Sequence, residues 1–106
     1  MNSSELKSQL INNQEKQVEI NDKISKLPKG HINTLYRNNK GYYYLTYRNG
    51  QKINNDYLGP VGKVDLNDML SKLNERSKLK KELSELKTEE KNIKKQIKKT
   101  NGISQE

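Results

Sequence analysis

The sequence predicts an α+β fold in which an N-terminal helix, a three-stranded antiparallel sheet and a long C-terminal helix follow one another. The stretches near both ends carry apolar residues at alternating spacings of four and three, which is typical of coiled-coil helices. All six tyrosines lie between residues 36 and 57, and such a cluster favours strands. At 106 residues we expect a single domain, 1–106, in which the two helices pair as an antiparallel coiled coil.

The first helix is predicted over residues 4–26. Its seam, with alternating steps of four and three residues, is occupied by Leu6, Leu10, Asn13, Gln17, Ile20, Ile24 and Leu27. Asn13 and Gln17 are polar interruptions, and polar residues at such positions select the partner and the register of a coiled coil. Pro28 ends the helix because the residue before a proline avoids the helical conformation.

The sheet is predicted over residues 32–58, with strands at about 32–37, 41–47 and 51–58. The first turn is expected at Asn38-Asn39-Lys40, and the second at Arg48-Asn49-Gly50 as a three-residue loop closed by a left-handed Gly50. This loop pairs Tyr47 with Gln51. The alternative, a two-residue Asn-Gly turn, shifts the register by one and mixes apolar and polar residues on both faces.

The three-residue loop divides the side chains between two faces. The face expected to contact the helices holds Tyr43, Leu45, Tyr47, Ile53 and Tyr57. The face expected to be exposed holds Tyr42, Tyr44, Thr46, Lys52, Asn54 and Asp56. Aromatic rings can stack on bases, asparagine amides can bond adenine edges, and basic side chains can hold phosphates. The exposed face therefore predicts a nucleic-acid contact surface.

The second helix is predicted over residues 65–99, followed by a frayed tail over 100–106. Asp65 is a favourable N-cap. The later part of its seam is formed by Leu79, Leu83, Leu86, Glu90, Ile93 and Ile97. These residues match the spacing of the first seam, so they predict the pairing of the two helices.

The formal net charge of +8 is concentrated in two places. Residues 28–64 contain six basic residues and one acid, Asp56, for a net charge of +5. After Glu90 the second helix carries five lysines without an acidic neighbour: Lys91, Lys94, Lys95, Lys98 and Lys99. Localised positive charge attracts polyanions. At the helix end, a purely solubilising surface is the alternative reading.

Several function classes are disfavoured by the composition. The chain has no Cys and only one His, His31, so neither disulfides nor a thiolate or histidine-rich metal site is expected. No motif places a nucleophile beside His31, and the carboxylates are mostly at helix-surface spacings, so we expect no enzymatic activity and no cofactor. No stretch is apolar enough for a signal peptide or a membrane span. We expect a protein of the bacterial host cytoplasm without a membrane partner.

The string Gly41-Tyr-Tyr-Tyr-Leu-Thr-Tyr-Arg48, followed by Lys52 and by Tyr57-Leu58-Gly59, resembles a hairpin of mobile-element proteins. It is similar to the small sheet of integrase arm-type DNA-binding domains and to the leading hairpin of some transposases. The helix–hairpin–helix order also resembles an uncharacterised family of short bacterial, archaeal and phage proteins. The arm-type resemblance implies a DNA-reading sheet with contacts at Tyr42, Tyr44, Arg48 and Lys52. This chain departs from that plan by its long first helix and by the lack of an attached recombinase or nuclease domain.

Three functions remain open from the sequence. The first is a small basic DNA- or RNA-binding accessory protein of phage or mobile-element origin. The second is a phage inhibitor, such as an anti-CRISPR protein, that binds a host nucleoprotein complex. The third is a structural coiled-coil adaptor, with homodimerisation through the helices. For the first function the predicted nucleic-acid-binding residues are Arg37, Lys40, Tyr42, Tyr44, Arg48, Lys52, Asn54, Lys91, Lys94, Lys95, Lys98 and Lys99.

Overall fold

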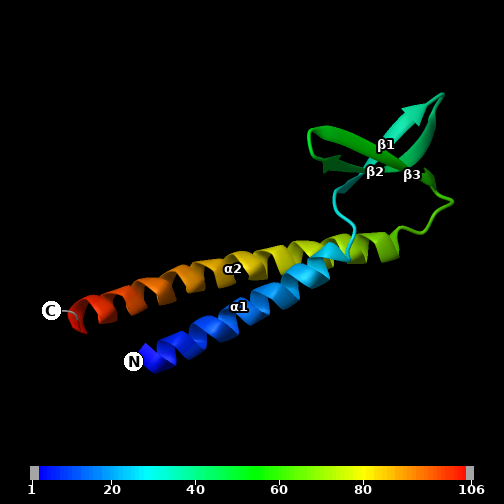
Figure 1. The fold of residues 1–106 in the computed structure, drawn as a ribbon. Coiled ribbons are helices and arrows are strands. Elements are labelled where there is room, and N and C mark those ends of the chain that lie inside the picture. The colour runs from blue at the N-terminus through cyan, green and yellow to red at the C-terminus, as the bar shows by residue number, and fades with distance from the viewer. Residues whose placement is uncertain (1–2, 105–106) are drawn as a thin grey trace. The chain divides into compact units, whose positions relative to one another are not determined.

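The fold class predicted from the sequence is confirmed by the structure, a computed structural model that describes residues 3–104. Two helices flank a three-stranded antiparallel sheet in chain order (Figure 1). The elements are α1 (Ser3–Ser25), β1 (His31–Arg37), β2 (Lys40–Asn49), β3 (Lys52–Pro60) and α2 (Asn67–Ser104). Helix α2 continues beyond residue 99, where its end was predicted, and the last two residues of the predicted tail lie outside the described residues.

The chain forms two compact units. The helix-pair unit comprises residues 3–26 and 77–104, and the sheet unit comprises Leu27–Arg76. Helix α2 contributes its first turns to the sheet unit and its remainder to the helix-pair unit.

In the helix-pair unit, α1 and α2 run antiparallel beside one another, as predicted (Figure 1). Leu6, Ile20 and Ile24 of α1 and Ile93 of α2 are buried. All the other predicted seam positions of both helices are at least half-buried. The alternating spacing of four and three thus identified the paired faces, because residues at these spacings lie along one side of a helix.

The polar positions of this seam bond to one another across the two helices. Asn13 is only 3% exposed, and its Nδ2 donates to the carbonyl oxygen of Leu86 at 2.9 Å. Gln17 Nε2 donates to Asn13 Oδ1 at 2.7 Å and to Glu90 Oε1 at 3.2 Å. Gln14 Nε2 donates to Glu90 Oε2 at 3.1 Å. The helix pair therefore contains a polar layer formed by Asn13, Gln14, Gln17 and Glu90.

The polar layer also changes the acidity of Glu90. Hydrogen bonds from Gln14 and then Gln17 stabilise the carboxylate and lower the pKa of Glu90 below its ordinary range. Lys94 lies one turn further along α2, with its Nζ 3.5 Å from Glu90 Oε2, and lowers the pKa of Glu90 by a smaller amount. The seam glutamate is thus favoured in its charged form.

The start of α2 confirms Asp65 as the capping residue. The backbone N–H of Asn67 donates to Asp65 Oδ1 at 2.9 Å, which satisfies one of the unpaired donors at the helix N-terminus. Within the same sheet unit, Arg76 Nη1 donates to the carbonyl oxygen of Leu27 at 3.1 Å. The Arg76 bond therefore joins the two ends of the sheet unit.

The sheet has the strand order β1-β2-β3. Arg37 pairs directly with Lys40, so the first turn consists of Asn38 and Asn39 alone. Both asparagines have positive φ angles, 52° and 66°. A type I′ hairpin turn requires positive φ at both central positions, and asparagine is among the residues that tolerate it. Lys40, expected in the turn, is the first residue of β2.

The register predicted for the second hairpin is wrong. Asn49 pairs with Lys52, which leaves Gly50 and Gln51 as a two-residue loop. Gly50 has a φ of 65° at the first central position, where a type II′ turn requires glycine. Tyr47 consequently pairs with Asn54 and not with Gln51. The observed partner of Tyr47 is three residues further along β3 than the predicted one. Because three is an odd number, this shift turns the side chains of β3 to the other face.

A bulge in β3 adjusts this register near its end. Tyr44 pairs with Tyr57 and Tyr43 pairs with Gly59, so Leu58 is the extra residue. Gly59 has a φ of 140°, and a β-carbon at this position would collide with Cγ2 of Val64. The close approach of Val64, which follows the sheet, therefore requires glycine here.

Neither helix of the described residues combines the length and the apolar character that a membrane crossing requires.

Candidate nucleic-acid interface

The observed register divides the sheet into two faces of different character. Side chains alternate along a strand, and directly paired residues point to the same side. The face that carries Tyr42, Tyr44 and Tyr57 is called the tyrosine face. The face that carries Leu45 and Asp56 is called the opposite face. Since Leu45 is buried, the opposite face contains the apolar centre of the sheet.

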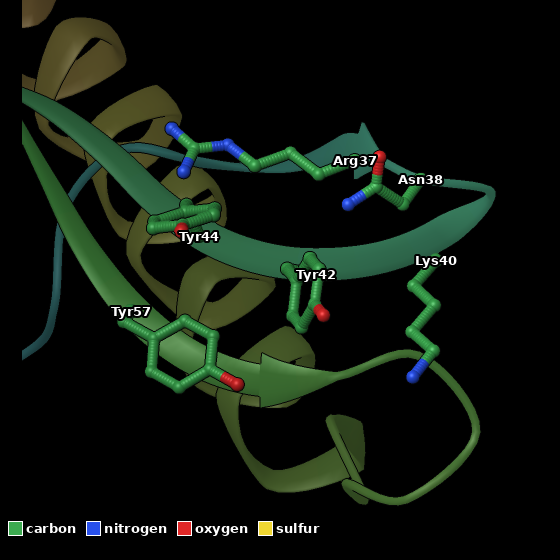
Figure 2. Close-up of a pocket in the computed structure, with 6 residues that line it drawn as sticks. All are labelled: Arg37, Asn38, Lys40, Tyr42, Tyr44 and Tyr57. Carbon is green, nitrogen blue, oxygen red and sulfur yellow. The ribbon is translucent and has the colours of Figure 1, made fainter.

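Three tyrosines form the centre of the tyrosine face. The ring centroid of Tyr57 lies 5.4 Å from that of Tyr44 and 6.3 Å from that of Tyr42. The ring planes are tilted by 55° and 50°, an edge-to-face type of contact that leaves the rings unstacked on one another. The ring of Tyr57 comes from β3 and the other two rings come from β2 (Figure 2).

These rings line an open hollow of about 450 Å³ together with Arg37, Asn38 and Lys40. Figure 2 shows the Arg37 side chain extended along the sheet with its guanidinium group towards Tyr44. Lys40 lies at the end of the hollow nearest the first turn (Figure 2). The hollow thus combines aromatic walls with two basic side chains. An anionic ring compound suits this combination, because its ring can stack and its charge can pair.

A chain of hydrogen bonds crosses the same face next to the tyrosines. Asn33 Nδ2 donates to Thr46 Oγ1 at 2.7 Å, and Thr46 Oγ1 donates to Asn55 Oδ1 at 2.7 Å. The three residues come from β1, β2 and β3 in turn. This chain holds the strands together and fixes the orientation of both amides.

The charge on the tyrosine face is entirely positive. Arg37 and Lys40 lie at one end, and Arg48 lies at the other end of β2, beside a smaller hollow of about 270 Å³. A further hollow of about 470 Å³, which shares Lys40 and Tyr42 with the first, is also lined by Lys63. Asp56, the only acid of residues 28–64, belongs to the opposite face. The field over the tyrosine face therefore attracts anions.

On the opposite face, Asp56 is engaged by its neighbours. A hydrogen bond from the Tyr47 hydroxyl to the Asp56 carboxylate, together with the charge of that carboxylate, raises the pKa of Tyr47. Lys29 Nζ lies 6.0 Å from the centroid of the Tyr47 ring. The acid and two further polar side chains, Lys52 and Asn54, are thus directed away from the three tyrosines.

The tyrosine face also leaves apolar surface uncovered within its unit. Tyr57 is 57% exposed, Ile53 is 61% exposed and Leu35 is 49% exposed. Single exposed apolar residues are common on proteins, but three on one face of a small sheet indicate a contact surface.

The structure brings together part of the site predicted from the sequence. Arg37, Lys40, Tyr42 and Tyr44 line one hollow. Arg48 shares their face at its far end.

Other predicted site residues lie elsewhere. Lys52 and Asn54 were expected on the same face as Tyr42, and this expectation is wrong because the β2–β3 register places them on the opposite face. The five lysines of α2 are exposed in the helix-pair unit, where Lys94 is paired with Glu90: Lys91, Lys94, Lys95, Lys98 and Lys99.

Tyr57, Asn38 and Lys63 line the hollows but were not among the predicted site residues. Tyr57 was expected on the face that contacts the helices and Asn38 in the first turn, and Lys63 lies between the predicted sheet and the predicted second helix. The signal for Tyr57 was Gly50 followed by Gln51, since glycine at the first loop position favours a type II′ turn and thereby the observed register. No pattern in the sequence indicates the position of Lys63, because it follows the sheet.

Among residues 3–104, no group of three His, Cys, Asp or Glu side chains lies close enough together to hold a metal ion.

Comparison of this chain with protein-family models, with curated proteins and with solved structures finds no match. The resemblance to integrase arm-type domains and to short phage and bacterial helix–hairpin–helix proteins therefore stays a prediction.

Proposed function

We propose that this chain is a nucleic-acid-binding accessory protein whose contact surface is the tyrosine face. The observation that carries the proposal is the hollow in which Tyr42, Tyr44 and Tyr57 lie beside Arg37 and Lys40. Nucleic acids combine flat aromatic bases with a continuous line of negative phosphates. Proteins bind them with aromatic platforms next to basic side chains.

The distribution of charge supports this ligand class over a neutral aromatic one. The tyrosine face carries three basic residues of the sheet, whereas Asp56 lies on the opposite face and is bonded to Tyr47. A surface that binds neutral aromatic compounds or apolar peptides does not require basic residues on one face of the sheet and the acid on the other. Phosphate contacts, in contrast, depend on basic groups without nearby acids.

The proposal is tested by titrating labelled DNA and RNA oligonucleotides with the full chain at several salt concentrations. If about three phosphates are contacted, the logarithm of the association constant falls with the logarithm of salt with a slope of about −2 to −3. Lys40→Gln reduces the magnitude of this slope by about one, since one phosphate contact is lost.

Lys52→Gln is the matched control, because it removes the same charge from the same sheet on the opposite face. We expect it to leave affinity and slope close to those of the unchanged protein. Equal effects of the two variants would assign binding to overall charge and not to the tyrosine face. Absence of binding to every oligonucleotide would refute the proposed function.

A second candidate function, the coiled-coil adaptor, is favoured by α1. Ile11 and Val18 are 55% and 70% exposed, and their spacing of seven residues places them on the same side of α1. Two such residues form a short apolar stripe that a second helix could cover. Sedimentation at increasing protein concentration tests it, and Ile11→Ser with Val18→Ser should abolish any association that is observed.

A further inference from the structure

We infer that the tyrosine face takes single-stranded nucleic acid in preference to duplex, with an unstacked base held against Tyr44 and Tyr57. This inference rests on the proposed function and narrows its substrate class. It is carried by the geometry of the rings, by the hydrogen bonds of the neighbouring asparagines and by the position of the basic residues.

The faces of the tyrosine rings are available for stacking, whereas a duplex exposes no base faces that could stack on them. In a double helix the base faces are stacked on one another, so only base edges are accessible in the grooves. Tyr57 makes tilted contacts with Tyr42 and Tyr44, so no ring of this group is stacked on another. An unpaired base can stack on such a ring, and this interaction is a main source of affinity in single-strand binding.

The polar groups of the tyrosine face are poorly suited to reading base edges in a groove. An asparagine recognises adenine with its amide oxygen and amide nitrogen together. In Asn33 the nitrogen donates to Thr46, and in Asn55 the oxygen accepts from Thr46. The bonds to Thr46 therefore use one of the two hydrogens on the Asn33 nitrogen and one of the two lone pairs on the Asn55 oxygen, and they hold each amide in an orientation set by the sheet. These hydrogen bonds tie the three strands together, so the aromatic rings remain the main surface for contact with a nucleic acid.

The size of the hollow agrees with this occupant. Its volume of about 450 Å³ falls within the range of roughly 300–1,000 Å³ found for small-molecule sites, so a nucleotide has room in it. The exposed side chains of Leu35 and Ile53 extend the apolar surface on the same face. A flexible single strand can follow this surface more closely than a stiff duplex.

Lys40 and Arg48 lie at the two ends of the tyrosine face, and the guanidinium group of Arg37 extends towards the ring of Tyr44 between them (Figure 2). At 3.3 Å per residue, the eight steps from Lys40 to Arg48 along β2 span roughly 26 Å. A strand in a stacked duplex advances 3.4 Å per nucleotide and an unstacked strand advances more, so this length accommodates at most about eight nucleotides. We therefore expect phosphate contacts near Lys40 and near Arg48, with bases on the tyrosines between them.

The test compares one labelled sequence of about eight to twelve nucleotides as single-stranded DNA, as single-stranded RNA and as duplex DNA, by fluorescence anisotropy with the full chain. We expect both single strands to bind at least tenfold more tightly than the duplex. Tyr57→Ala should weaken single-strand binding about tenfold, whereas Tyr57→Phe should retain it, because stacking needs the ring and not the hydroxyl. Since Tyr57 is more than half exposed, its replacement should leave the sheet folded, which circular dichroism checks.

A second measurement locates the stacked base. Oligonucleotides that contain 5-iodouracil crosslink to aromatic side chains on irradiation, and mass spectrometry identifies the modified residue. Crosslinks at Tyr42, Tyr44 or Tyr57 support the inference. Crosslinks confined to Tyr47 on the opposite face overturn it.

The outcomes separate the inference from the proposed function. If duplex binds as tightly as single strands and Lys40→Gln weakens both, the preference for single strands is refuted while the nucleic-acid function stands. If neither form binds, both proposals fail. If single strands bind but Tyr57→Ala and Tyr44→Ala have no effect, the stacking site is refuted.

Discussion

The two units of this protein depart from the usual distribution of side chains in opposite directions. The helix-pair unit buries a polar residue, Asn13, and satisfies it with the Leu86 carbonyl and with Gln17. The sheet unit leaves Ile53 and Tyr57 more than half exposed. A buried polar group and an exposed apolar patch are the informative exceptions in a fold. The first points to a role in defining how the helices pair, and the second points to a role in binding.

The difference implies that mutations in the two units affect different properties. Changes in the seam of the helix pair should alter stability, because the seam supplies most of the buried apolar residues within the described part of the chain. Changes on the tyrosine face should alter affinity and leave the fold in place. Substitutions in each unit test this difference.

The largest expected effect is that of Leu6→Ala in the seam. Leu6 is 2% exposed, and truncation of a fully buried leucine costs about 3–4 kcal/mol, through lost burial and a residual cavity. Urea denaturation followed by circular dichroism measures the change. Val18→Ala on the exposed side of α1 is the control and should cost less than about 0.5 kcal/mol. Similar losses at the two positions would contradict the assigned seam.

Gly59→Ala tests the bulge at the end of β3, beyond Tyr57. The residue has a φ of 140° and is in close approach to Val64, so we expect a loss of about 2–3 kcal/mol from strain and collision together. Gly62→Ala is the matched control, since its φ of 85° is also positive but no atom lies within 4 Å of the added carbon. It should cost only about 1 kcal/mol. An equal cost at both sites would show that Val64 does not restrict position 59.

Asn13→Leu tests whether the polar layer serves specificity. A polar residue in a coiled-coil seam defines register and association state at a cost in stability, so the substitution should raise the free energy of unfolding by about 1 kcal/mol. We also expect additional association states in sedimentation experiments. If the variant is less stable and its association is unchanged, the layer contributes to stability alone.

The smallest expected effect is the pH dependence that comes from Glu90. Its pKa is lowered in the folded state by Gln14 and Gln17, so the carboxylate contributes stability at neutral pH. This contribution is lost as the pH falls below the ordinary glutamate range and through the lower folded-state pKa. Denaturation curves at decreasing pH should show a smaller acid-side loss for Glu90→Gln. A loss of the same size in that variant would assign the acid sensitivity to other carboxylates.

The helices and their paired faces could be predicted from the sequence. Leu6, Asn13, Ile20 and Ile24 follow a spacing that repeats along one side of a helix, and all four are buried. The N-cap Asp65 could also be predicted, because capping depends on groups only two residues away. The first hairpin turn was located correctly within one residue, since two adjacent asparagines favour positive φ angles.

The face of each β3 residue could not be predicted from the separation of apolar and polar residues. That separation collects the apolar residues of the sheet on one face, so it groups Ile53 and Tyr57 with Leu45. The structure separates them, because Gly50 closes a two-residue loop that sets the register of β3 as far as Tyr57. An exposed apolar surface violates the expectation of a single apolar side, and this violation is what makes the surface a candidate site.

Periodicity and composition, which act over a few residues, are enough to predict the helical segments and the seam that pairs them. They also predict the concentration of tyrosine and positive charge in the sheet and two of the three rings of the hollow. The folded sheet is needed to show that Tyr57 joins Tyr42 and Tyr44, that Lys52 and Asn54 turn away from them, and that Lys63 approaches the same end of the sheet. Strand register transmits the conformation of one turn to every side chain of β3 as far as Tyr57. Beyond Tyr57 the strand bulges and Gly59 comes close to Val64, which lies outside the sheet.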